Sequence, residues 1–297
     1  MEIQDTTKVP TGLSLYSAAA QRAAREVIYS YSTSFGLATR LLGKEYQGHV
    51  ENIYALVRVA DEIVDGSAAE AQLLQPQVNP AQLLSEFENE TYRAMEIGYS
   101  TNLVIHAFAL TARATGIKRE IVEPFFFSMR QDLTETQHNQ QSFEKYVYGS
   151  AEVVGLMCLQ VFMHGKTYSE SEQEKLVLGA RALGSAFQKV NFLRDLSADF
   201  KRLGRSYFPG VDVKSFNEET KQRLVDDIKV DLGVSAQSLP LLPKSARRAV
   251  AAAQLLFTTL NNQIEKTSAT ELINRRISVG SARKASLLIR ALIGAKV

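Results

Sequence analysis

Residues 53–66 read Ile53-Tyr-Ala-Leu-Val-Arg-Val-Ala-Asp-Glu-Ile-Val-Asp-Gly66, and this segment carries the strongest structural signal in the chain. Its apolar residues recur at spacings of three and four, which is the period of an amphipathic helix. A second line of residues, polar and at helical spacing, runs beside them: Tyr54, Arg58, Asp61 and Asp65. The segment therefore predicts a helix with an apolar face and a polar rail, meaning a row of ligand-type side chains.

The rest of the chain follows the same helical period. The prolines leave two long segments free, 11–75 and 125–208, and Phe187, Val190 and Leu193 mark a further helical stripe. Residues 245–264 are rich in strong helix formers behind a candidate cap at Ser245. Glycine and proline predict loops at 66–80, 203–217 and 233–244. We expect one all-α domain over residues 1–297, with a flexible N-terminus at 1–15.

Composition excludes several classes of protein. Of the 297 residues, 45% are hydrophobic and 22% charged, which rules out wholesale disorder. A net charge of +2 provides no broad surface for nucleic acid. The single cysteine, Cys158, excludes an internal disulfide and a cysteine-based zinc site, and its apolar surroundings predict a buried thiol. Without a signal pattern at the N-terminus or a long apolar run, we expect a soluble, cytoplasmic protein.

A second polar rail follows later in the chain, at Gln188, Asn191, Asp195 and Asp199. Each rail places two aspartates four residues apart, an arrangement that destabilises a helix by about 0.2–0.5 kcal/mol. Two explanations remain open for what offsets this destabilisation in both helices. The aspartates form structural salt bridges with Arg58 and Arg194, or they bind a divalent cation.

Carboxylate and amide oxygens without nearby Cys or His suit Mg²⁺ or Mn²⁺. Two facing rails would hold a cluster of such ions around a diphosphate, and the residues that follow the second rail, Arg205 and Tyr207 among them, are placed to clamp the same anion. A helical di-iron oxidase is disfavoured, because Glu135 and His138 form a single Glu-x-x-His motif where two are needed.

These segments resemble the squalene/phytoene synthase family, whose members join two prenyl diphosphates head to head. The resemblance runs over about residues 31–209, closest to the bacterial phytoene synthases, and four segments carry it in order: Ser32-Thr-Ser-Phe35, residues 54–65, residues 128–132 with 146–155, and residues 191–199 with 204–209. Residues 275–279 are similar to a basic patch near the end of phytoene synthases. The chain departs from the family pattern at Glu62, Thr33, Ser150 and Glu152.

The resemblance implies a helical bundle of the isoprenoid synthase type with a central apolar cavity. It also implies roles for single residues. Metal ligands are Asp61, Asp65, Asn191, Asp195 and Asp199. Residues that bind substrate are Ser32, Phe35, Tyr54, Arg58, Gln188, Asn191, Arg205 and Tyr207. The four aspartates and Tyr146 are catalytic.

The reaction implied is Mg²⁺-dependent condensation of two geranylgeranyl diphosphates to phytoene through a cyclopropyl diphosphate. This is the first committed step of carotenoid biosynthesis. The alternatives are a C30 enzyme that makes squalene or dehydrosqualene from farnesyl diphosphate, and a non-catalytic protein that binds prenyl diphosphates. Long hydrocarbon products suggest transient membrane contact, for which residues 281–297 offer a basic, amphipathic segment, although core packing is the favoured role of that segment.

Overall fold

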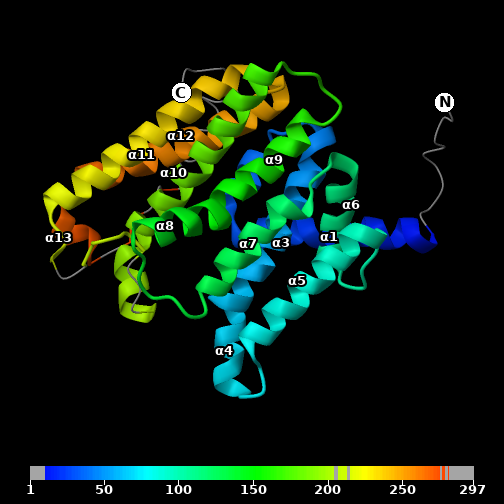
Figure 1. Cartoon of the computed structure of the whole chain (residues 1–297), viewed down its shortest axis with the longest axis horizontal. Helices are drawn as coiled ribbons and strands as arrows, with labels where there is room; N and C mark the ends of the chain where they lie inside the picture. The colour runs from blue at the N-terminus through cyan, green and yellow to red at the C-terminus, as the bar shows by residue number, and fades with distance from the viewer. Residues whose placement is uncertain (1–10, 204–206, 213–214, 275, 278–279, 281–297) are drawn as a thin grey trace.

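The computed structural model describes residues 11–203, 207–212, 215–274, 276–277 and 280, with the backbone alone at 33–34 and 197–203. Every regular element in these ranges is helical and none is a β-strand, so the predicted all-α class is confirmed (Figure 1). The helices in chain order are α1 (Gly12–Tyr31), α2 (Thr33–Thr39), α3 (Lys44–Val64), α4 (Ser67–Leu74), α5 (Pro80–Ile97), α6 (Leu103–Thr115), α7 (Arg119–Gln131), α8 (Gln140–Val147), η1 (Tyr148–Glu152), α9 (Val153–Met163), α10 (Glu170–Leu203), α11 (Glu218–Ser238), η3 (Leu239–Leu241), α12 (Lys244–Lys266) and α13 (Ala269–Leu272).

Helix α3 contains the segment with which the sequence argument began. Ile53, Leu56 and Ala60 are at most 1% exposed, so the apolar stripe predicted from its spacing lies in the core. The helix ends at Val64, and Asp65 is its C-terminal cap with non-helical backbone angles. Asp65 therefore lies one residue beyond the helix on which the sequence placed it.

Helices α8, η1 and α9 form one continuous rod through the centre of the bundle (Figure 1). By length and composition, residues Gln140–Met163 are apolar enough to cross a membrane. The rod contains core residues, however, since Val153 and Met157 are fully buried. Core helices pass the same test, so the finding is weak support for a membrane span. Its middle is a π-helical turn, η1, a feature that often marks functional sites.

The predicted loops are only partly correct. Helix α10 ends at Leu203 and α11 begins at Glu218, which matches the loop predicted at 203–217. Helix α4 occupies much of the loop predicted at 66–80, and α11 continues through Gly233 to Ser238. Gly233 is tolerated because a glycine inside an exposed helix costs only about 1 kcal/mol. Helix α12 starts at Lys244 behind Pro243, so Ser245 is not its cap. At the N-terminus, residues 12–15 form the first turn of α1, and residues 1–10 lie outside the described part.

Candidate active site

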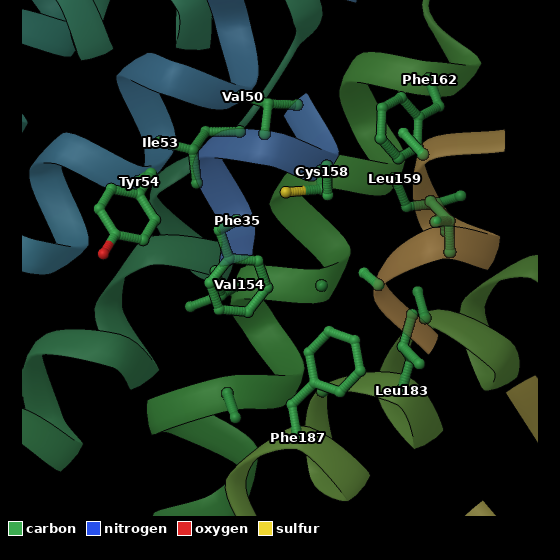
Figure 2. A pocket seen from close by; sticks show the side chains of 18 of the residues that line it. Phe35, Val50, Ile53, Tyr54, Val154, Cys158, Leu159, Phe162, Leu183 and Phe187 are labelled. Atoms are coloured by element: carbon green, nitrogen blue, oxygen red, sulfur yellow. The ribbon is translucent and has the colours of Figure 1, made fainter. Parts of the chain in front are cut away.

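A pocket of about 300 Å³ lies among α2, α3, α10, α12 and the rod of η1 and α9. Its wall is mostly hydrocarbon and aromatic, as Figure 2 shows for Ile53, Val154, Leu183 and Phe187. The sulfur of Cys158 lies on the same wall, and burial raises the pKa of this thiol to about 12. The thiol is therefore protonated at neutral pH. Cys158 is half-buried, whereas the sequence predicted a buried thiol.

The pocket is elongated along α10. Residues of α10 line it from Leu176 to Asn191, which corresponds to about 22 Å of helix at 1.5 Å per residue. The region near Leu176 and Phe162 is apolar, whereas Gln188 and Asn191 contribute side-chain amides at the other end of this row. The pocket thus offers a long and mostly apolar space with side-chain amides at one end, while Ser235 and Ser238 line it near Gly179 toward the other.

Aromatic rings gather at the wall formed by α2 and α3. The ring of Phe35 lies 6.2 Å from that of Tyr54, 5.8 Å from that of Phe187 and 5.9 Å from that of Phe257, measured between centroids. Phe35 and Tyr54, two predicted substrate-binding residues, both line the pocket. Burial raises the pKa of the Tyr54 hydroxyl above its ordinary value of 10.0, so this phenol is neutral at neutral pH. These rings offer π faces to a positive charge in the pocket.

The first polar rail continues along α3 beyond the pocket. Arg58 donates to Asp61 at 2.7 Å and also pairs with Glu62. Glu62 accepts a further hydrogen bond from the backbone N–H of Ser67 at the start of α4. Burial by itself would raise the pKa of Glu62, but the Ser67 N–H and Arg58 outweigh it and the pKa is lowered. Glu62, one of the departures named from the sequence, thus anchors Arg58 and the α3–α4 junction.

The second polar rail continues along α10. Asp195 pairs with its neighbour Arg194 at 2.5 Å and with Arg276, whose Nε lies 2.6 Å from the carboxylate. The side chain of Asp199 and the whole of Arg205, both predicted site residues, lie outside the described residues. The sequence argument gave Arg276 no role at the second rail, although its patch at 275–279 was the available signal.

Both rails extend past the same end of the pocket. In Figure 2, Tyr54 lies below Val50 on α3 and Phe187 lies below Leu183 on α10, so both helices run downward in this view. Asp61 follows the pocket residue Val57 by four positions, and Asp195 follows the pocket residue Asn191 by four, about 6 Å in each helix. The carboxylates therefore lie beyond the polar end of the pocket.

The salt bridges that the sequence left open are present at Asp61 and Asp195, each paired with arginine. In donor chemistry these carboxylates and the amide of Asn191 fit Mg²⁺ or Mn²⁺. Among the side chains that the structure describes, no three of His, Cys, Asp or Glu gather closely enough to hold a metal ion. Cation binding at the rails thus stays a prediction.

Tyr146 and Tyr207, both predicted to serve the site, are buried beside the second rail rather than in the pocket wall. The ring of Tyr207 stacks on Phe192 at 4.1 Å and on Tyr146 at 5.7 Å. The hydroxyl of Tyr146 donates to Asp132 at 2.8 and 3.0 Å. Sequence reasoning placed Asp132 in a family segment but gave it no role.

Ser32, a predicted substrate-binding residue, has a local structural role. The Ser32 side chain caps α2 by accepting a hydrogen bond from the backbone N–H of Phe35 at 3.1 Å. This bond fixes the backbone position from which the Phe35 side chain extends.

Ser150 lines the pocket from the π-helical turn, and its hydroxyl is buried without a hydrogen-bond partner among the described residues. Glu152 pairs with Arg181 at 2.7 Å and is not a pocket residue. Of the departures at Ser150 and Glu152, only the one at Ser150 lies in the pocket wall. The side chain of Thr33 lies outside the described residues.

Comparison with known proteins places these features in a family context. Residues 28–283 match the family model described as squalene/phytoene synthase. The 15-cis-phytoene synthase of Pantoea ananas is 26% identical over 278 residues, which cover 88% of this chain and 87% of that protein. The chloroplastic phytoene synthase 1 of Solanum lycopersicum is 30% identical over 210 residues, or 70% of this chain and 48% of that protein. The chain spans about half the length of the plant relatives it matches.

Solved structures show the same fold. A dehydrosqualene synthase solved with a ligand superimposes with a TM-score of 0.76 at 22% identity, covering 94% of this chain and 97% of that one. A squalene synthase from Alicyclobacillus acidocaldarius gives 0.72 at 18% identity, covering 90% and 98%. The predicted isoprenoid synthase type of bundle is confirmed.

Proposed function

The chain belongs to the squalene/phytoene synthase family, and from this premise we propose that it joins two geranylgeranyl diphosphates head to head to give phytoene. The observation that carries the proposal is the long apolar pocket with amides at one end and the carboxylates of both rails beyond that end. Apolar walls suit prenyl chains, and charged groups beyond the pocket suit the diphosphates. The phytoene synthases among the relatives support the choice of substrate.

Binding would begin at the polar end. Arg58, half-buried beside Asp61 and Glu62, provides a guanidinium for diphosphate oxygens, and the amides of Gln188 and Asn191 add hydrogen bonds. A divalent cation held by Asp61, Asp65, Asn191, Asp195 and Asp199 would supply positive charge to the departing diphosphate. Arg205, outside the described residues, would add a second guanidinium to the same anion.

The pocket then has to protect a carbocation. Loss of diphosphate leaves an allylic cation that water would quench, so a dry wall is required. The faces of Phe35 and Tyr54 would stabilise the positive charge by about 0.5–2 kcal/mol per ring. The second prenyl diphosphate attacks the cation to form the cyclopropyl intermediate. A second ionisation, a rearrangement and loss of a proton then yield the hydrocarbon.

The test uses purified protein, Mg²⁺ and either geranylgeranyl or farnesyl diphosphate, without nicotinamide. Hydrocarbons are extracted and identified by mass spectrometry, with Asp61→Ala and Asp195→Ala as controls. We expect a C40 product from the wild type and none from either variant. A C30 product made from farnesyl diphosphate alone would show that the substrate is farnesyl diphosphate and that the type of reaction is as proposed. Absence of both product and diphosphate release would favour a protein that binds prenyl diphosphates without converting them.

Location in the cytoplasm with transient membrane contact is part of the same proposal. Residues 281–297, the segment suggested for that contact, lie outside the described residues. Co-sedimentation with liposomes measures the contact directly. Binding that is unchanged after deletion of residues 281–297 would contradict a role for this segment.

A further inference from the structure

Two serines of α11, Ser235 and Ser238, lie at the end of the pocket opposite the rails, where the proposed reaction gives them no part. Both line the pocket near Gly179 of α10, and they are 1% and 6% exposed. A prenyl chain whose diphosphate lies at the rails would point its hydrocarbon end toward these serines. We call the pocket surface formed by Gly179, Ser235 and Ser238 the floor.

The floor is closed because α10 and α11 touch there. A Cβ on Gly179 would lie 2.0 Å from the Oγ of Ser238 and 2.4 Å from its Cβ, so the absence of a side chain at Gly179 is what lets the two helices meet. A buried hydrogen bond also ties α11 to α12, since Gln254, which is 2% exposed, donates to the carbonyl of Leu232 at 2.8 Å. A ligand that lengthened the pocket would therefore have to separate packed helices.

Both floor hydroxyls already use their protons within the protein. Ser238 donates to the backbone carbonyl of Ser235 at 2.9 Å, and Ser235 donates to the Oε1 of Gln254 at 3.4 Å. A serine hydroxyl has one proton and two lone pairs, so the floor can offer only acceptor oxygens to whatever fills the pocket. Hydrocarbon pressed against these oxygens removes the water that would donate to them and supplies no donor in its place.

The position of the floor sets the length of chain that the pocket holds. Gly179 precedes Asn191, at the polar end, by about 18 Å of helix. A chain that spans this distance ends at the floor. A longer chain has to fold back on itself or press its end against the oxygens of Ser235 and Ser238.

We propose that the floor limits the length of the prenyl chain by its polarity, so that Ser235 and Ser238 determine specificity at the end of the pocket remote from the reaction. The inference rests on the proposed function and deepens it. A chain that stops at the floor leaves the two oxygens hydrated, whereas a chain one prenyl unit longer covers them with hydrocarbon and binds less tightly. The ligands excluded are prenyl diphosphates longer than geranylgeranyl diphosphate.

The experiment uses the full chain, Mg²⁺ and an equimolar mixture of geranylgeranyl diphosphate and the C25 geranylfarnesyl diphosphate, with hydrocarbon products identified by mass spectrometry. We expect the wild type to use the C20 substrate almost alone. Ser235→Ala should raise use of the C25 substrate relative to the C20 substrate by about fivefold, the scale of one lost hydrogen bond.

Ser235→Cys separates polarity from space. Cysteine is no smaller than serine, but its sulfur is a weak acceptor, so this variant should shift the preference in the same direction as Ser235→Ala. A shift in Ser235→Ala without one in Ser235→Cys would assign the preference to the room in the pocket and overturn the inference. If Ser235→Ala does not fold, as judged by circular dichroism, Ser238→Ala must show the shift or the inference is wrong.

Thr259→Val is the matched control. It removes a buried hydroxyl of α12 that bonds one turn back, to the carbonyl of Leu255 at 2.8 Å, and Thr259 is not a pocket residue. It should leave the preference between the two substrates unchanged, and an equal shift in this variant would overturn the inference.

The failure of the inference and that of the proposed function are distinguishable. An unchanged preference in folded Ser235→Ala and Ser238→Ala, beside an active wild type, overturns the inference alone. A wild type that makes hydrocarbon only from farnesyl diphosphate overturns the proposed substrate, and the same shift must then appear between the C15 and C20 substrates or the inference is wrong as well. A wild type that makes no hydrocarbon overturns both together.

Discussion

The carboxylate of Asp195 on α10 lies 2.6 Å from the Nε of Arg276, a residue 81 positions later in the chain. Asp195 also pairs with Arg194, so two guanidinium groups converge on one carboxylate. A bound cation would compete with both of them for the same oxygens. The side chain of Arg276 is 64% exposed, so it can leave the carboxylate at little cost.

The first prediction concerns this competition. Arg276→Ala should reduce the Mg²⁺ concentration needed for half-maximal activity by up to about fivefold, because an exposed ion pair contributes at most about 1 kcal/mol. Titration of activity with MgCl₂ measures the effect. Arg248→Ala, which removes an exposed arginine from α12, controls for the change in net charge. A higher Mg²⁺ requirement in Arg276→Ala would show that Arg276 assists the bound state instead of competing with it.

The second prediction separates activity from stability at the first rail. The side chain of Asp61 is 42% exposed and pairs with Arg58 on the same helix, so Asp61→Asn should change the free energy of unfolding by less than about 0.5 kcal/mol. Activity should fall at least about 100-fold, because the variant removes a carboxylate that we propose holds the divalent cation. Denaturant unfolding and product formation are measured on the same preparation, with Glu70→Gln on α4 as an exposed control. Full activity in Asp61→Asn would show that this aspartate is not a ligand of the metal.

The third prediction concerns the wall between the rod and α10. A Cβ on Gly184 would lie 2.6 Å from the carbonyl oxygen of Ala151 and 2.9 Å from the Cα of Glu152. Gly184→Ala should therefore lower the free energy of unfolding by about 1–3 kcal/mol, since backbone atoms have to move. Gly233→Ala is the matched control on α11, where a Cβ meets nothing within 4 Å, and it should stabilise the protein by about 0.4–1 kcal/mol. Thermal unfolding of both variants measures the contrast, and equal effects would contradict the close approach.

Sequence patterns predicted what depends on near neighbours in the chain. The buried stripe of α3 follows from a period of three to four, and the long helices follow from the placement of proline. The pairs Asp132–Tyr146 and Asp195–Arg276 depend on how separate helices meet, and no local pattern encodes that. The π-helical turn η1 adds one residue to a helical turn, a change too small to alter the hydrophobic period. The rails and the salt bridges of Arg58 and Arg194 were predicted from spacing, whereas the pairing of Asp195 with Arg276 required the structure.

The fourth prediction concerns Glu62 and acid stability. Its pKa in the folded protein lies below the ordinary 4.5, because the Ser67 N–H and Arg58 favour the charged form over the opposing effect of burial. A lowered pKa stabilises the folded state above the unfolded value, and this contribution is lost as the pH falls below 4.5. Glu62→Gln should therefore cost about 1 kcal/mol at neutral pH and progressively less in acid. Urea unfolding across this range measures the difference, and a cost independent of pH would contradict the assignment.

The last prediction concerns the choice of substrate at Ser150. This residue lines the pocket on the rod, and the turn that carries it is fixed against α10 by the contact of Gly184 with Ala151. A valine at position 150 has a larger side chain than serine. Because the backbone of this turn cannot shift to make room for it, the pocket becomes narrower. We expect Ser150→Val to reduce use of the C20 substrate relative to the C15 substrate by about tenfold, the scale of one methylene in a rigid pocket.

Competition between geranylgeranyl and farnesyl diphosphate in one reaction measures the preference as a ratio of C40 to C30 product. Ser150→Ala removes only the hydroxyl and should leave the ratio near that of the wild type. Ser150→Thr keeps the hydroxyl and adds one methyl group, so it should fall between the wild type and Ser150→Val. A ratio that shifts equally in Ser150→Ala and Ser150→Val would assign the effect to the buried hydroxyl. Because that hydroxyl has no described partner, the effect would then come from a hydrogen bond to the ligand rather than from the width of the pocket.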